Sequence, residues 1–132
     1  MYGFHATVQG PFDRAVTQVI EALKAEGFGV LSDIDIAKAM KDKLGADMPP
    51  YRILGACNPP LAQRALQADA DIGLLLPCNV TVRQGQGDDV IVGFLDPQTM
   101  VSLTGNPAVR VVADDASARL HRVQDALGAA VR

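Results

Sequence analysis

The sequence predicts an α+β domain whose sheet is mixed and largely antiparallel, with helices packed on one face. Short segments in which apolar residues alternate with polar ones are interleaved with segments in which apolar residues recur every three or four positions. Two consecutive strand-like segments, Ile72 to Arg83 and Asp89 to Leu95, are joined by a glycine-containing turn typical of a hairpin. The predicted order β-α-β-α-β-α-β-β-α contains this hairpin, which disfavours a doubly wound parallel sheet.

The first part of the chain alternates between strand and helix. Tyr2 to Gln9 alternates apolar and polar side chains, as a half-buried strand does. Gly10-Pro11 begins an amphipathic helix that Gly27 ends. Phe28 to Ile34 is again strand-like, and the short amphipathic helix after it ends at Gly45.

Prolines mark the helix starts in the rest of the chain. Tyr51 to Cys57 is predicted to be the third strand, and the helix after it has Asn58 as its N-cap and proline in its first position. Asp96-Pro97 repeats the pattern for one short turn of helix. Asn106-Pro107 repeats it again before a long final helix with one apolar stripe.

The start of the final helix allows two predictions. The segment Val109 to Val112 has high β propensity and is compatible with a strand. Apolar residues at helical spacing continue from this segment to Leu127, which favours the helix.

Composition predicts one domain spanning residues 1–132, because 48% of the residues are apolar and domains of about 100–150 residues are the commonest size. The net charge of −3 and the scattered Lys and Arg residues disfavour a nucleic-acid partner. No segment approaches the roughly 18 apolar residues that a membrane span needs. Because the chain begins on a strand-like segment rather than on a signal sequence, we expect a cytoplasmic protein without a membrane partner.

The two cysteines of the chain each precede an asparagine, in Cys57-Asn58 and Cys78-Asn79. Period-two alternation points both sulfurs to the apolar side of their strands. Buried cysteines often act only as small hydrophobic residues. The alternative is thiol chemistry: a helix start beside Cys57 would stabilise its thiolate, and neighbouring strands would bring the two thiols together as a redox pair or as ligands of a soft cation.

That argument assigns each cysteine to one side of its strand. The third strand places Cys57 on the same side as Tyr51, Ile53 and Gly55, and the fourth places Cys78 on the same side as Leu74, Leu76, Val80 and Val82.

The helix start beside Cys57 also suggests a binding site for a small molecule or anion. Free amides at a helix N-terminus bind anions and carboxylates. We therefore predict Cys57, Asn58, Cys78 and Asn79 as ligand-binding residues. Asn79 also has a simpler interpretation as a strand residue that faces solvent.

No catalytic set, metal site or cofactor is expected, and we do not predict an enzyme. His5 and His121 are both predicted to be exposed, so a site of two histidines and two cysteines would require distant elements to converge. Gly85 and Gly87 lie between two antiparallel strands, whereas a phosphate-binding loop lies between a strand and a helix.

Three segments resemble hallmark stretches of the family called domain of unknown function 302. They are Gly27-Phe-Gly-Val-Leu, Pro50-Tyr-Arg-Ile-Leu-Gly-Ala-Cys-Asn-Pro-Pro-Leu-Ala and Ile72-Gly-Leu-Leu-Leu-Pro-Cys-Asn-Val. The resemblance covers nearly the whole chain, and Cys57 and Cys78 both match the family's Cys-Asn positions. It implies a small bacterial or archaeal α+β domain that associates as a homodimer, without an established activity.

These observations lead to two expectations about function. The first is a non-catalytic homodimeric binding or interaction module, with a pocket formed around Cys57 to Leu61 and Leu76 to Asn79. The alternative is a thiol-based redox, sulfur-transfer or soft-metal-binding protein that uses Cys57 and Cys78.

Overall fold

The structure, a computed structural model, describes the backbone of residues 2–130 and the side chains up to residue 128. In chain order its elements are β1 (Gly3–Gln9), α1 (Phe12–Ala25), β2 (Gly29–Asp35), α2 (Ile36–Leu44), β3 (Tyr51–Cys57), α3 (Pro59–Ala68), the 3₁₀ helix η1 (Ala70–Leu75), β4 (Cys78–Gln84), β5 (Asp89–Leu95), α4 (Gln98–Thr104) and α5 (Pro107–Ala130). None of the helices among the described residues is long and apolar enough to cross a membrane.

The five strands form one sheet in the order β1-β5-β4-β3-β2, and every pair of neighbours is antiparallel. The register aligns Phe4, Phe94, Val80 and Leu54 in one row across four strands. The predicted α+β class and element order are therefore confirmed.

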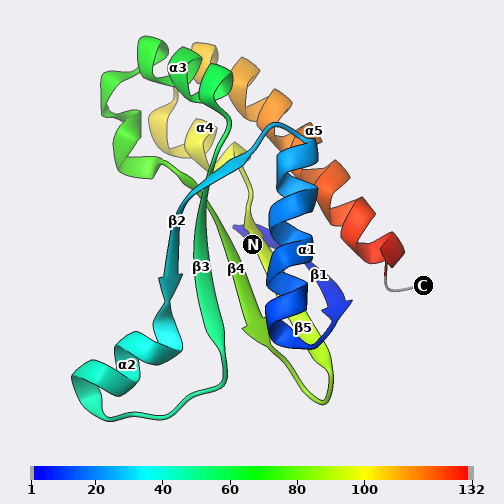
Figure 1. Ribbon diagram of the computed structural model, residues 1–132. Helices are drawn as coiled ribbons and strands as arrows, with labels where there is room; N and C mark the ends of the chain where they lie inside the picture. The colour runs from blue at the N-terminus through cyan, green and yellow to red at the C-terminus, as the bar shows by residue number, and fades with distance from the viewer. Residues whose placement is uncertain (1, 131–132) are drawn as a thin grey trace.

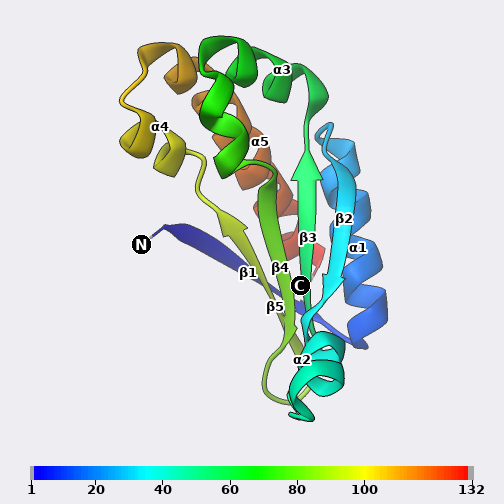
Figure 2. The same cartoon turned by 90° about the vertical axis from the view of Figure 1, so that its left-hand side faces the viewer.

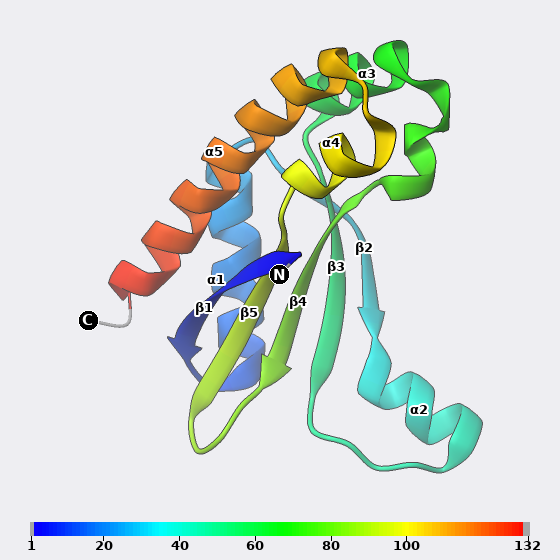
Figure 3. The same cartoon turned by 180° about the vertical axis from the view of Figure 1, so that it is seen from behind.

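Helices α1 and α5 cover one face of this sheet (Figure 1), while within residues 2–130 no helix covers the opposite face (Figure 3). Helices α3 and α4 lie at one end of the strands and α2 lies at the other (Figure 2). The core fills the space between the covered face and the two long helices. Its most deeply buried large side chains are Leu23, Leu54, Ile72, Leu120, Val8, Val19, Val80, Val82, Val90, Val92, Val109 and Val123.

The polar residues before the prolines cap their helices as predicted. Asn58 Oδ1 accepts a hydrogen bond from the Leu61 amide at 3.3 Å, and Asn106 Oδ1 accepts one from the Ala108 amide at 2.9 Å. The final helix α5 includes Val109 and Val112, so the strand alternative for this segment is wrong. These two valines lie three positions apart and are both buried, which a helix allows and an alternating strand does not.

One predicted strand begins too early in the sequence. Ile72 to Leu75 belongs to η1, and β4 begins only at Cys78. The Asp69 carboxylate accepts a hydrogen bond from the Asp71 amide at 3.0 Å, and the Asp69 carbonyl accepts one from Ile72 at 3.1 Å, so the chain turns here. A run of apolar residues fits a strand or a short buried helix equally well, so periodicity alone cannot show that Ile72 to Leu75 is helical.

The prediction of which side of β3 faces the helices is also wrong. Leu54 and Ala56 face the helices, which places Tyr51, Ile53 and Gly55 on the open face. Nearly every residue of this strand is apolar, so alternation alone cannot identify its buried side. The register with Val80 and Cys78 of β4 decides it.

The segment from β2 to the end of the loop after α2, residues 29–50, is named here the β2–α2 arm. Strand β2 pairs only with β3, and an irregularity between Val30 and Ser32 interrupts the register at Leu31. A bidentate ion pair joins Asp33 of β2 to Arg52 of β3, and the Arg52 guanidinium holds the pKa of Asp33 below its usual value. Helix α2 buries none of its residues, so the arm is held mainly by β3.

The turn after α1 provides a test of packing against Asn58. Gly27 has a φ of +86°, and a Cβ there would lie 2.9 Å from Asn58 Nδ2, whereas Gly45 has a φ of +66° with nothing within 4 Å. We expect Gly45→Ala to lower the free energy of unfolding by about 1 kcal/mol through backbone strain. Gly27→Ala should lower it by about 2–4 kcal/mol, because it also displaces a buried amide. Urea unfolding followed by circular dichroism measures both, and equal losses would contradict the role given to the Asn58 contact.

Candidate functional site

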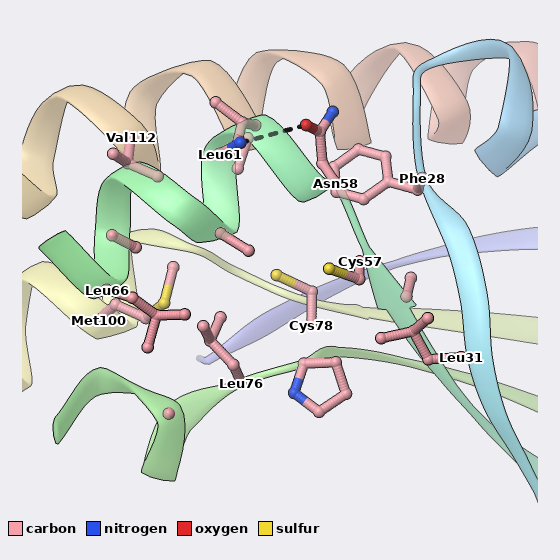
Figure 4. A pocket seen from close by; sticks show the side chains of 16 residues that line it. Phe28, Leu31, Cys57, Asn58, Leu61, Leu66, Leu76, Cys78, Met100 and Val112 are labelled. Atoms are coloured by element: carbon pink, nitrogen blue, oxygen red, sulfur yellow. Dashed lines mark hydrogen bonds between the residues drawn. The ribbon is translucent and has the colours of Figure 1, made fainter. Parts of the chain in front are cut away.

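The pairing of β3 with β4 brings the two cysteines to the same end of the sheet. Ala56 lies opposite Cys78 in the register, and Cys57 follows Ala56 where β3 leads into α3. Both thiols line a cavity of about 300 Å³ beneath α3 (Figure 4). The expectation that the two cysteine-bearing strands are neighbours, beside the start of a proline-led helix, is confirmed.

This cavity is lined almost entirely by carbon and sulfur atoms. Helix α3 provides one wall, and the rest comes from the ends of β3 and β4, from η1 and the segment after it, from α4 and α5, and from the start of β2 with the residue that leads into it. Among the described lining residues, Asn58 alone has a polar side chain other than the thiols. The lining residues are Phe28, Leu31, Ala56, Cys57, Asn58, Leu61, Ala62, Ala65, Leu66, Gly73, Leu76, Pro77, Cys78, Met100, Val112 and Ala116.

The two thiols differ in their surroundings. Cys78 is buried and points to the helix-covered face with Val80, whereas Cys57 is half-buried, and neither forms a disulfide. Burial raises the pKa of Cys78 to about 11, and the nearby Cys57 contributes to the increase. Cys78 is therefore a neutral thiol at neutral pH, which suits an apolar environment.

Asn58 is the one buried polar residue among the described side chains, with 8% of its surface exposed. Its Oδ1 accepts from the Leu61 amide, and its Nδ2 donates to the Glu26 carbonyl at 3.5 Å. Both ends of the amide are thus used to join the start of α3 to the end of α1. This arrangement avoids the free-energy cost of an unpaired buried amide.

The start of α3 has no free amide for the predicted anion. Its first two residues are prolines, which lack an N–H group. The next two amides are used within the protein, because Leu61 donates to the Asn58 side chain and Ala62 donates to the Asn58 carbonyl at 2.9 Å. The helix N-terminus therefore gives no support to an anion site, and the case for a ligand depends on the cavity instead.

Asn79 lies apart from the other three predicted site residues. It alternates with Cys78 and Val80 along β4, so its exposed side chain is on the open face of the sheet. The structure thus brings together Cys57, Asn58 and Cys78 at one cavity and places Asn79 outside it.

Ionic contacts hold α3 against α5 above the cavity. Asp115 of α5 pairs with Arg119 at 2.8 Å and with Arg64 of α3 at 3.4 Å. The Arg119 hydrogen bond holds the pKa of Asp115 below its usual value, so this carboxylate is charged at neutral pH. Arg119 also donates to the Glu26 carbonyl at 3.1 Å, where the Asn58 amide donates too.

Several cavity residues could not be found by motif or spacing. Phe28, Leu31, Met100 and Val112 come from four separated segments and look like ordinary core residues in the sequence. Leu31 is 73% exposed although it lines the cavity, so the wall formed by β2 is partly open to solvent.

Metal binding at this site would depend on two sulfurs. Among the described residues, no group of three or more His, Cys, Asp or Glu side chains is arranged to hold a metal ion. His121 is not among the residues that line the cavity, and its ring stacks on Phe4 of β1 with centroids 4.1 Å apart.

Comparisons with known proteins agree with this fold. The family model described as "Domain of unknown function DUF302" matches residues 4–127. The crystal structure of an uncharacterized conserved protein DUF302 from Bacillus stearothermophilus is 31% identical in sequence, with a TM-score of 0.87 over 96% of this chain and 98% of that chain. No curated protein matches the chain significantly. The chain therefore belongs to the DUF302 family.

Proposed function

We propose that this protein is a non-catalytic binding module whose cavity beneath α3 takes a small apolar molecule. The observation that carries the proposal is a cavity of about 300 Å³ whose described lining residues include no charged side chain. Ligand pockets of proteins begin at about this volume and are mostly apolar. An apolar occupant would gain free energy from leaving water without leaving a polar group unpaired.

The Asn58 amide and the Cys78 thiol at the cavity wall support the same ligand class. The Asn58 amide is already paired with protein groups, and the Cys78 thiol is neutral at neutral pH. Neither offers a free charge to a polar ligand. Cys57, Asn58 and Cys78 would therefore shape and close the site rather than hold a charged group.

Filling the cavity from α3 tests this proposal. Ala62 lines the cavity, so Ala62→Leu should occupy part of it, whereas Ala118→Leu adds the same atoms on an exposed part of α5. Amide NMR titration with benzene and with n-hexanol is expected to give saturable shifts near Ala62, Ala65 and Cys57 in the wild type. We expect Ala62→Leu to weaken this binding about tenfold or more, which corresponds to loss of one or two methylene contacts.

Circular dichroism checks that both variants are folded. Ala118→Leu is the binding control and should bind both probes as the wild type does. Absence of saturable shifts with either probe, or equal binding by Ala62→Leu, would rule out an apolar ligand site here.

The alternative function is thiol chemistry, and one observation favours it: Cys57 and Cys78 line the same cavity close enough for the charge of one to affect the other. The neutral state of Cys78 weighs against it, because the thiolate is the nucleophile and the metal ligand. A redox, sulfur-transfer or soft-metal role would require Cys78 to lose its thiol proton.

Alkylation rates distinguish the two functions. In the variant Cys57→Ser the reaction of iodoacetamide with Cys78 should still increase with pH well above about 8.5, because burial, the larger cause of the raised pKa of this thiol, remains. In the wild type, where the pKa of Cys78 is about 11, only about one molecule in a thousand would carry the thiolate at pH 8. The same variant in concentrated urea should react with an apparent pKa of about 8.5. An apparent pKa near or below 8.5 in the folded protein would favour thiol chemistry instead.

We also infer that the module acts as a homodimer joined through the β2–α2 arm. The outer edge of β2 has unpaired backbone groups, and Ile34, Leu44 and Met48 expose apolar surface on the arm. The arm carries charges of both signs, four aspartates and three lysines, so a second copy would not meet a surface of uniform like charge. Leu31 belongs to both the arm and the cavity, so a partner copy would also cover the open wall of the site.

Sedimentation velocity tests the dimer. The wild type should sediment as a dimer, and Leu44→Glu or Ile34→Glu should shift it to a monomer, because a charge buried in an apolar contact is costly. The control is Leu103→Glu on α4, a residue of similar exposure (66%, against 74% for Leu44) that lies away from the arm. A monomeric wild type, or a dimer that survives both arm substitutions, would contradict this interface.

A further inference from the structure

The open face of the sheet is turned toward the viewer in Figure 3. It contains a second hollow, of about 320 Å³, lined by residues of β1, β5, β4 and β3. It differs in chemistry from the thiol cavity, because polar and aromatic side chains line it. The residues that define its character are Tyr51, Asn79, Thr81, Arg83 and His5. No Asp or Glu is among its lining residues.

A glycine forms the floor of this hollow. The register places Gly93 of β5 between Thr81 of β4 and His5 of β1. A Cβ at Gly93 would lie 2.6 Å from Thr81 Oγ1 and 3.5 Å from the His5 ring. The absence of a side chain at Gly93 therefore lets the Thr81 hydroxyl and the His5 ring approach each other across β5.

The cation in the hollow is not neutralised by the protein. Arg83 is half-buried and lies opposite Tyr51 in the register. Within residues 2–128 its guanidinium makes no ion pair or side-chain hydrogen bond, whereas Arg52, Arg64, Arg119 and Arg122 each pair with a carboxylate. A planar guanidinium with free donors fits the two oxygens of a carboxylate or a phosphate.

We propose that this hollow binds a small planar molecule that carries a carboxylate or phosphate group. Arg83 holds the anionic oxygens, with Asn79 and Thr81 as further polar groups on the same strand. The planar part packs against the aromatic rings that line the hollow, those of Tyr51 and His5. The site is separate from the thiol cavity, because alternation along β4 points Asn79, Thr81 and Arg83 away from Cys78 and Val80.

Amide NMR titration with benzoate, phenyl phosphate and benzamide at constant ionic strength tests the proposal. Benzamide has the shape of benzoate without its charge. We expect saturable shifts at Thr81, Arg83 and Gly93 with at least one of the two anions, and binding of benzamide about tenfold weaker or more, since charge-assisted hydrogen bonds are lost. The two anions distinguish a carboxylate from a phosphate ligand.

Two variants of Arg83 and one control variant test the role of Arg83. Arg83→Gln should lower affinity for the preferred anion about tenfold or more, and Arg83→Lys should restore part of it because the charge remains. Arg110→Gln removes an equal charge from an exposed site on α5 and should bind as the wild type does. The proposal is overturned if neither anion gives saturable shifts, if benzamide binds equally well, or if Arg83→Gln and Arg110→Gln have the same effect.

Discussion

The buried amide of Asn58 is the constraint on which the cavity depends. An amide removed from water must keep its hydrogen bonds, and this one divides them between the Leu61 amide in α3 and the Glu26 carbonyl at the end of α1. Gly27 has no side chain and permits this close approach. The position of α3 over the end of the sheet, and with it the wall of the cavity, follows from these contacts.

The two faces of the sheet present different electrostatic environments from one strand. Along β4, Cys78, Val80 and Val82 face the helices, while Asn79, Thr81 and Arg83 face the open side. The covered side keeps its thiol protonated because charge is costly there. The open side can keep an unpaired guanidinium because water still solvates it. Strand β4 thus separates the apolar cavity that contains Cys78 from the open face that carries Arg83.

The two ends of the molecule are held in different ways. At the cavity end, α3 is tied to α1 and α5 by the Asn58 amide and by the contacts of Asp115 and Arg119. At the other end, the β2–α2 arm depends on its pairing with β3 and on the Asp33–Arg52 ion pair, and α2 buries no side chain. Apolar burial stabilises the first end far more than the second, which leaves the arm free to make contacts with another surface.

The sequence by itself determined the local features: the alternating first strand, the hairpin with its glycine turn, the asparagine and proline helix starts, and the family of the chain. These depend on residues close together in the chain. Only the tertiary structure decided that Leu54 and Ala56 face the core and that Ile72 to Leu75 is not a strand. An uninterrupted apolar segment has the same periodicity for either face, so its orientation is set by the partner strands and helices that fold against it.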